Sequence, residues 1–222
     1  MPSSIINPQT NETLAPYQFD AAVTISGANL AGGTTAFSPA NVGLKAWTFP
    51  LFLASGTGAA TTAQDLYLAQ VNLSTATTFG NIYVNAVAVG TTNPSTTASF
   101  AGVYYVNTGS TAALVASTAQ IGSATGTTTG FKTYPLTAQF TTAGTGQYYV
   151  GVLYGTGTQP QLATPTGATA TSTGATIAAG PVATAASYPF VLGGTSLSSL
   201  PTTITLSSDA LTGALVFWAG LA

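Results

Sequence analysis

Apolar and polar side chains alternate in short runs along most of the chain. One such run covers residues 82–89, where Ile82, Val84, Ala86 and Ala88 alternate with Tyr83, Asn85, Val87 and Val89. A period of two residues is typical of β-strands, because successive side chains point to opposite faces of a sheet. We find no long stretch with the spacing of three and four residues that an amphipathic helix needs. The pattern therefore predicts an all-β chain.

Strands are expected over segments that are separated by turns rich in glycine, threonine, serine and asparagine. These segments are residues 44–53, 66–73, 82–89, 100–106, 112–116, 131–140, 147–154, 188–192, 202–206 and 215–219. Pro50 interrupts the first of them, which indicates an edge or a bend. Residues 107–111 and 141–146 are interpreted as two hairpin connections. Nine or ten strands, with the last ones closing the sheets, favour a jelly-roll-like antiparallel β-sandwich.

Two regions depart from this pattern. Residues 1–40 contain four prolines and few apolar runs, and we interpret them as an extended N-terminal arm rather than a loose terminus. Its isolated apolar side chains need something to pack against, so they are candidate assembly anchors: Ile5, Ile6, Leu14, Tyr17 and Phe19. Residues 41–222 would then form the sandwich, with a low-complexity surface loop near residues 155–187.

The charge content is very low, with four acidic and two basic residues among 222. The chain has no His, Arg or Cys, which removes the usual zinc ligands, thiol chemistry and disulfides. Two lysines give almost no support for binding a nucleic-acid backbone. We expect no metal and no cofactor. A net charge of −2 provides little repulsion between copies, so the chain is expected to assemble and to form a homo-oligomer.

The few charged residues offer little catalytic chemistry. Asp65 and Asp209 could form a glycosidase-like pair if the fold brought them together, but both have the sequence context of ordinary turn aspartates. Lys45 and Lys132 lack the Ser-x-x-Lys spacing of a Ser–Lys dyad. The apolar stretch near residues 211–222 is about half as long as a membrane-spanning helix, and we interpret it as a core strand. We expect no catalysis and no membrane insertion.

Aromatic residues are the more informative group. Strand alternation should send one ring of each adjacent tyrosine pair, Tyr104 with Tyr105 and Tyr148 with Tyr149, to the outside of a sheet. Outward rings could stack on a sugar or on a neighbouring protein, and the candidates for such contacts are Tyr105, Tyr149 and Tyr154. The alternative for each ring is packing against its cross-strand neighbour.

An ordered series of segments resembles a domain of the minor tail and tail-fibre proteins of phages that infect actinobacteria. The segments are residues 65–73, 99–104 with 108–116, 130–137, 146–154 and 215–221. The resemblance covers about four fifths of the chain and implies a virion structural protein with a β-sandwich fold and no catalytic residues. The chain departs from the family in its length, because only about 40 residues precede the domain, where such domains often terminate longer proteins with a shaft.

We therefore expect a non-enzymatic phage virion protein, located in the minor tail, tail tip or fibre, that presents its sandwich for host-surface adhesion. Its partners would be other virion proteins, further copies of itself and a host-surface glycan. The alternative is a capsid decoration or head-fibre subunit on the virion surface. A surface polysaccharide hydrolase and a non-viral adhesin or surface-layer protein are further alternatives.

Overall fold

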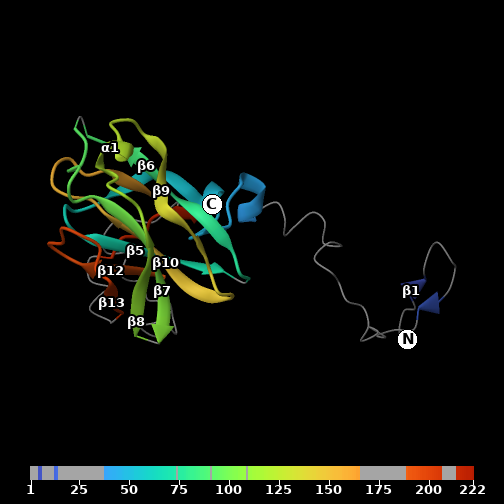
Figure 1. Ribbon diagram of the computed structural model, residues 1–222. Coiled ribbons are helices and arrows are strands. Elements are labelled where there is room, and N and C mark those ends of the chain that lie inside the picture. The colour runs from blue at the N-terminus through green and yellow to red at the C-terminus, as the bar shows by residue number, and fades with distance from the viewer. Residues whose placement is uncertain are drawn as a thin grey trace. The chain divides into compact units, whose positions relative to one another are not determined.

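The computed structural model describes residues 5–6, 13–14, 38–73, 75–90, 92–108, 110–165, 189–206 and 214–222. The chain divides into two units, Met1–Ser38 and Pro39–Ala222. In the first unit, strand β1 (Ile5–Ile6) pairs antiparallel with β2 (Thr13–Leu14), with Ile5 opposite Leu14. The second unit contains the remaining elements (Figure 1).

Two antiparallel sheets build the second unit. The first sheet has the strand order β12 (Phe190–Gly194), β5 (Leu66–Leu73), β10 (Gly146–Leu153), β7 (Phe100–Thr108), β8 (Thr111–Ser117) and β13 (Thr203–Thr205). The second has the order β3 (Ala46–Trp47), β14 (Ala219–Leu221), β6 (Thr78–Ala88), β11 (Gln161–Pro165) and β4 (Ala54–Ala60). The short helices are η1 (Pro39–Val42), η2 (Leu51–Leu53) and α1 (Gly122–Thr125).

Strand β9 (Gly130–Thr141) belongs to the second sheet and lies along β6. Ile82 of β6 is opposite Tyr134 of β9 and also opposite Leu221 of β14, so β9 and β14 flank β6 on its two sides. Beyond β9 a single bridge, Thr118 opposite Leu136, links the second sheet to the end of β8 in the first sheet. The sandwich is therefore closed along one side, at the seam between β8 and β9.

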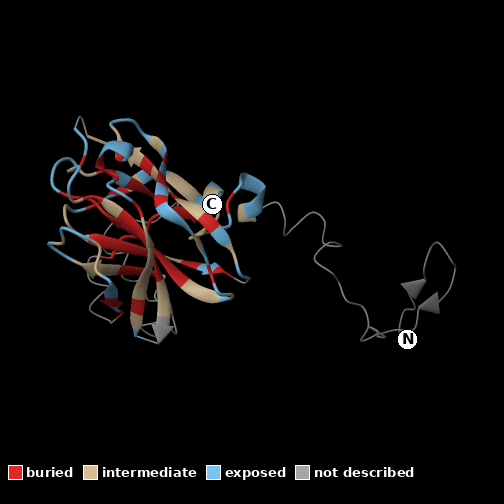
Figure 2. Cartoon of the chain, viewed as in Figure 1, coloured by how far each residue is buried: buried red, intermediate tan, exposed pale blue. Residues whose placement is uncertain are grey.

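The core lies between the two sheets, where Figure 2 shows the buried residues in red along the strands. Tyr67, Val150 and Val152 face the second sheet in this core. The opposite face of the first sheet is also covered, because Leu66 and Leu153 pack with Ile204 and Leu206 in a second apolar cluster. Strands that are buried on both faces carry near-continuous apolar runs, and this explains the sequences of β5 and β10.

The prediction of an all-β antiparallel sandwich is confirmed. The hairpin of β7 and β8 is also confirmed, with Thr108 opposite Thr111. The second predicted hairpin is wrong, because β9 pairs with β6 while β10 pairs with β5 and β7. The two-sided burial of β10 places it in the centre of the first sheet. The alternate residues of β9 are exposed, as expected for a strand with one open face, and β9 lies in the second sheet. Residues 142–145 therefore connect a strand of the second sheet to one of the first.

Other differences concern segments of small residues. The low-complexity loop predicted for residues 155–187 contains β11, in which Leu162 and Ala163 are fully buried. Strand β4 has the sequence ASGTGAA and no large apolar side chain, so its sequence did not predict a strand. The predicted strand over residues 44–53 is reduced to Ala46–Trp47 and η2, which Pro50 precedes. In the last apolar stretch, residues 214–218 are buried without forming a strand, and β14 follows them.

Candidate functional site

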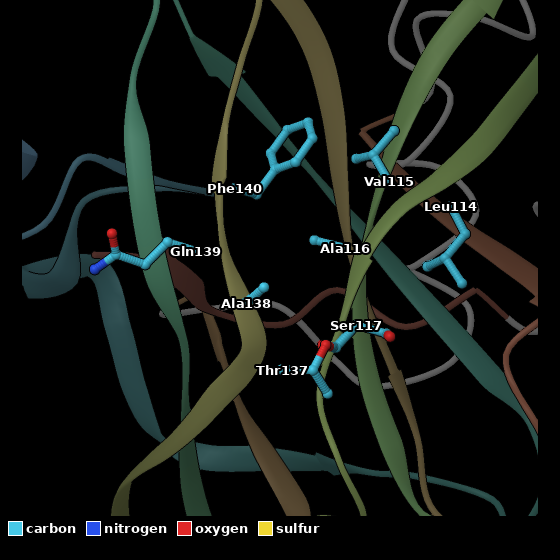
Figure 3. Close-up of a pocket in the computed structure, with 8 residues that line it drawn as sticks. All are labelled: Leu114, Val115, Ala116, Ser117, Thr137, Ala138, Gln139 and Phe140. Carbon is cyan, nitrogen blue, oxygen red and sulfur yellow. The ribbon is translucent and has the colours of Figure 1, made fainter.

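A groove of about 280 Å³ lies at the seam where the two sheets meet. We call it the seam groove, and its lining comprises Leu114, Val115, Ala116, Ser117, Thr137, Ala138, Gln139 and Phe140. Figure 3 shows β8 and β9 on its two sides, with Ala116 and Ala138 at the gap between the strands. At one end, Thr137 Oγ1 donates a hydrogen bond of 3.0 Å to the Ser117 carbonyl oxygen.

Two register shifts open the groove. Val103 of β7 is opposite Ala116, and Tyr104 is opposite Leu114, so Val115 is an extra residue that bulges β8. In the second sheet, residues 136–139 of β9 lie opposite the single residue Gly80 of β6. Bulges bend a strand and interrupt its ladder. Because both bulges lie at the same level of the seam, β8 and β9 separate beyond the Thr118–Leu136 bridge.

The lining of the seam groove is uncharged. Val115, Ala116 and Phe140 pack against the main core, and Phe140 also contacts the ring of Phe79 at a centroid distance of 5.7 Å. The polar groups at hand are hydroxyl, amide and backbone groups, none of which titrates near neutral pH. This arrangement suits the binding of a neutral, partly apolar segment rather than acid–base chemistry.

Asp65 and Lys132 each form hydrogen bonds within the domain, and they do so with different partners. The Asp65 carboxylate accepts a hydrogen bond of 3.5 Å from the Tyr67 hydroxyl and another from the Ser196 backbone, while partial burial raises its pKa. Lys132 lies at an inward position of β9, and its Nζ donates to the carbonyl oxygen and to Oγ1 of Thr128. Burial lowers the pKa of Lys132. Asp209 lies outside the described residues, so its pairing with Asp65 stays untested.

Backbone strain accompanies Asp65. Gln64 and Ser196 have positive φ angles of 64° and 55°, a region that non-glycine residues seldom occupy. The Leu197 amide donates to the Gln64 carbonyl oxygen at 2.8 Å, which ties the two strained turns together. No group of three or more His, Cys, Asp or Glu that could hold a metal ion forms in the described part of the chain. We therefore interpret Asp65 as a positioning group for two turns.

The tyrosine candidates divide into two groups. Strand alternation is confirmed, because Tyr104 and Tyr149 share one face of the first sheet and Tyr105 and Tyr148 the other. Tyr149 and Tyr154 are both 0% exposed, so the prediction that they contact a glycan or partner at the surface is wrong. The sequence could not show that both faces of this sheet are covered. Tyr105 is partly exposed and packs on Tyr148 at a ring-centroid distance of 5.0 Å.

The candidate anchor residues remain a prediction. Ile5, Ile6 and Leu14 belong to β1 and β2, for which the structure describes the backbone pairing alone. Tyr17 and Phe19 lie outside the described residues.

The sequence did not predict the aromatic surface on the outer face of the second sheet. We call this surface the outer aromatic face, and it consists of Trp47, Tyr83 and Phe131 around the buried Trp218. Trp47 and Tyr83 are both opposite Gly220, so they flank that glycine in one row across three strands. Phe131 is 54% exposed and packs edge-on against Trp218 at a centroid distance of 5.4 Å. Alternation along β6 and β9 was the signal available in the sequence. That alternation does not show which face of the sheet is open.

Three further exposed apolar side chains lie in the two short helices that precede β3 and β4. Val42 in η1 and Phe52 and Leu53 in η2 are 49%, 61% and 40% exposed. Large exposed apolar side chains that lie close in sequence are a common feature of protein contacts. None of the described helices is long and apolar enough to cross a membrane.

Comparison of the sequence with protein-family models gives no match, and no curated protein is significantly similar to it.

Proposed function

We propose that this chain is a non-enzymatic structural protein of a phage virion, located on the tail, where its sandwich adheres to the host surface. The resemblance of the five sequence segments to phage tail proteins supports the virion role. Four of these segments overlap with β5, β7 with β8, β9 and β10, which form the centre of the sandwich and its seam.

The observation that carries the adhesion role is the outer aromatic face. Trp47 and Tyr83 are partly exposed, and Phe131 is half-exposed on the same face of the sheet. Aromatic rings present flat apolar surface at a low cost in conformational entropy, and they are frequent at recognition surfaces. A neutral glycan needs stacking surface and hydroxyl partners rather than ions. Thr133 of β9 is exposed and lies opposite Tyr83 of β6, so its hydroxyl is available beside the aromatic rings.

The adhesion role is tested by binding of the labelled full chain to host cells. Phe131→Ser should reduce binding at least tenfold, whereas Thr203→Ser, at an exposed position on β13 of the first sheet, should leave it unchanged. The unfolding midpoint of each variant is measured in parallel, because Phe131 also packs on Trp218. Equal binding by folded Phe131→Ser, or no binding by the unaltered chain, would contradict the role.

A capsid decoration subunit is the second candidate. The exposed side chains of Val42, Phe52 and Leu53 favour it, because they suit a contact with another protein rather than with a hydrated glycan. The number of copies per virion distinguishes the two functions. Hundreds of copies would support the capsid, and single digits to tens would support the tail.

A further inference from the structure

Strand β4 lies at one end of the second sheet, and its outer edge is open. In the described part of the chain, β4 pairs with β11 alone. The Thr61 amide donates to the Pro160 carbonyl oxygen at 3.2 Å. The Thr57 carbonyl oxygen accepts a bond of 3.1 Å from Thr164 Oγ1, so it is also directed at β11. Because this direction alternates along a strand, every second residue directs its N–H and C=O groups away from the sheet. These residues are Gly56, Gly58 and Ala60.

The composition of β4 leaves this edge without most of the features that keep exposed strands apart. Natural edge strands are kept from pairing by charged residues, prolines or bulges. β4 has the sequence ASGTGAA, which contains no charge and no proline. It has one bulge, where residues 55–57 lie opposite Thr164, and residues 58–60 pair regularly beyond it. A Cβ at Gly56 would meet nothing within 4 Å, so this part of the edge is accessible.

We propose that β4 pairs antiparallel with β4 of a second copy of this chain. Identical strands that pair in this way are related by a two-fold axis, which is the most common symmetry of protein oligomers. β4 suits itself as a partner, because it offers the same row of N–H and C=O groups and carries no charge that would repel its equivalent. Gly56 and Gly58 also have no side chains that could collide across the axis. The net charge of −2 on 222 residues sets only a small electrostatic barrier to this association.

Hydrogen bonds within the chain place the two-fold axis at Gly58. Upstream, the Ala54 amide donates to a carbonyl oxygen of η2, and downstream the Thr62 amide donates to the Tyr67 hydroxyl at 3.0 Å. The open edge therefore lies between Ala54 and Thr62, and Gly58 is its midpoint. An axis at this point pairs Gly58 with its equivalent, and it pairs each of the other two outward residues with the other one across the axis.

Apolar side chains of η2 add to this contact. Phe52 and Leu53 are exposed and directly precede β4. In antiparallel pairing the start of each β4 lies beside the end of the other, so these side chains approach residues 61–64 of the second copy. A stable dimer buries more surface than a short strand ladder provides, and apolar side chains supply the core of such an interface.

The paired strands join the second sheets of two copies into one continuous sheet. A two-fold axis perpendicular to that sheet puts like faces on the same side, so the outer aromatic faces of both copies point in one direction. Two such faces on one sheet bind a repetitive surface more strongly than one face does. This consequence rests on the proposed adhesion role, whereas the pairing of β4 does not.

Removal of one edge N–H tests the pairing. Ala60→Pro deletes an outward N–H, and an edge strand tolerates proline where its N–H faces solvent. The matched control is Ala60→Ser, which keeps the N–H. Sedimentation of the full chain should give the mass of two copies for the natural chain and for Ala60→Ser, and of one copy for Ala60→Pro, while circular dichroism shows that each is folded. A monomeric natural chain, or a folded Ala60→Pro chain that keeps the mass of two copies, would overturn the inference.

Engineered disulfides test the register and do not depend on the proline variant. The natural chain has no cysteine. Full-length Gly56→Cys with an affinity tag is mixed with untagged Ala60→Cys under mild oxidation, and the mixed pair is quantified on a non-reducing gel. Residues that are opposite each other in an antiparallel pair have Cα atoms about 5.5 Å apart, a distance that a disulfide can span.

The control replaces Ala60→Cys by Thr203→Cys, at an exposed position on β13 of the first sheet. We expect at least a tenfold excess of the mixed pair with Ala60→Cys, and equal amounts would overturn the inference. β4 and the outer aromatic face share no residue. A monomeric chain that still binds host cells would therefore refute the pairing and leave the adhesion role intact.

Discussion

Tyr134 and Tyr154 share a hydrogen bond between their hydroxyls, 3.2 Å long, although they belong to different parts of the sandwich. Tyr134 is on β9 of the second sheet, and Tyr154 directly follows β10 of the first. Thr125 of α1 adds a bond of 3.1 Å to the Tyr134 hydroxyl and donates to the Ile121 carbonyl oxygen. All three side chains are buried, so this chain of hydroxyls joins both sheets to α1 in the interior.

Tyr134→Phe should lower the free energy of unfolding by about 1–3 kcal/mol, because it leaves the buried Tyr154 hydroxyl without its partner and removes one of the two hydrogen bonds of the Thr125 hydroxyl, which keeps its bond to the Ile121 carbonyl oxygen. The matched control is Tyr104→Phe. The Tyr104 hydroxyl is buried and has no hydrogen-bond partner within the described structure, so its removal should be neutral or stabilising. Denaturant unfolding measures both variants. Equal losses for the two would contradict a role of the Tyr134 hydroxyl in joining the sheets.

Alkaline pH should unfold the chain cooperatively. Burial raises the pKa of Tyr104, Tyr134 and Tyr149 above the ordinary value of 10.0, and that of Tyr154 well above it. The folded chain therefore keeps these protons when the unfolded chain would release them. The resulting stability is fully present below pH 10 and is lost as the pH rises above it.

This prediction is checked by following tyrosinate absorbance and circular dichroism together during an alkaline titration. The absorbance of the buried tyrosines should rise only as the β-structure is lost. Ionisation of all ten tyrosines near pH 10, with the sandwich still intact, would contradict it.

Lys132→Met should stabilise the chain by about 1 kcal/mol or more, because it replaces a buried amine that has no acidic partner in the described residues by an apolar side chain of similar length. Its partner Thr128 is exposed, so water can take over the bonds to that residue. Lys45→Met, at an exposed position, is the control and should change stability by less than about 0.5 kcal/mol. A clear loss of stability in Lys132→Met would show that the amine has a structural role that its bonds to Thr128 do not explain.

Gly122→Ala should be strongly destabilising, whereas Gly56→Ala should not. A Cβ at Gly122 would lie 2.6 Å from the Ser95 carbonyl oxygen and 2.7 Å from that of Pro94, and backbone atoms cannot move aside easily. We expect a loss of about 1–3 kcal/mol in the free energy of unfolding, as for other overpacked sites. A Cβ at Gly56 would meet nothing within 4 Å. Thermal melting of the two variants compares them, and similar midpoints would be inconsistent with the close approach at Gly122.

The sequence predicted strands well where large apolar residues alternate with polar ones or run continuously. β5, β6, β7 and β10 are of this kind, because their side chains fill the core or the second apolar cluster. It did not predict β4 and β11, whose small residues leave no periodic signal although backbone pairing holds them together. The sequence also did not predict the correct partner of β9. Whether β9 pairs with β10 or with β6 depends on how the whole sheet is buried, and not on the turn at residues 142–145.

The site was less predictable than the fold. By strand alternation, Tyr104 and Tyr149 occupy the face of the first sheet that points away from the second sheet. That face is nevertheless covered, because residues 197–206 contribute apolar side chains to the cluster around the two rings: Leu197, Leu200, Ile204 and Leu206. That coverage comes from a segment distant in sequence. The seam groove depends on two register shifts, and a shift of register leaves no mark in the pattern of single residues. The outer aromatic face could not be predicted, because the sequence does not show which face of the second sheet stays open.

The most direct test of the proposed function is the position of this protein on the phage particle. Purified virions are labelled with a gold-conjugated antibody against the full chain and imaged by electron microscopy. We expect the label at the tail tip or along a tail fibre, in single digits to tens of copies. Label spread over the capsid would instead favour the decoration role, and particles without label would contradict a virion protein altogether.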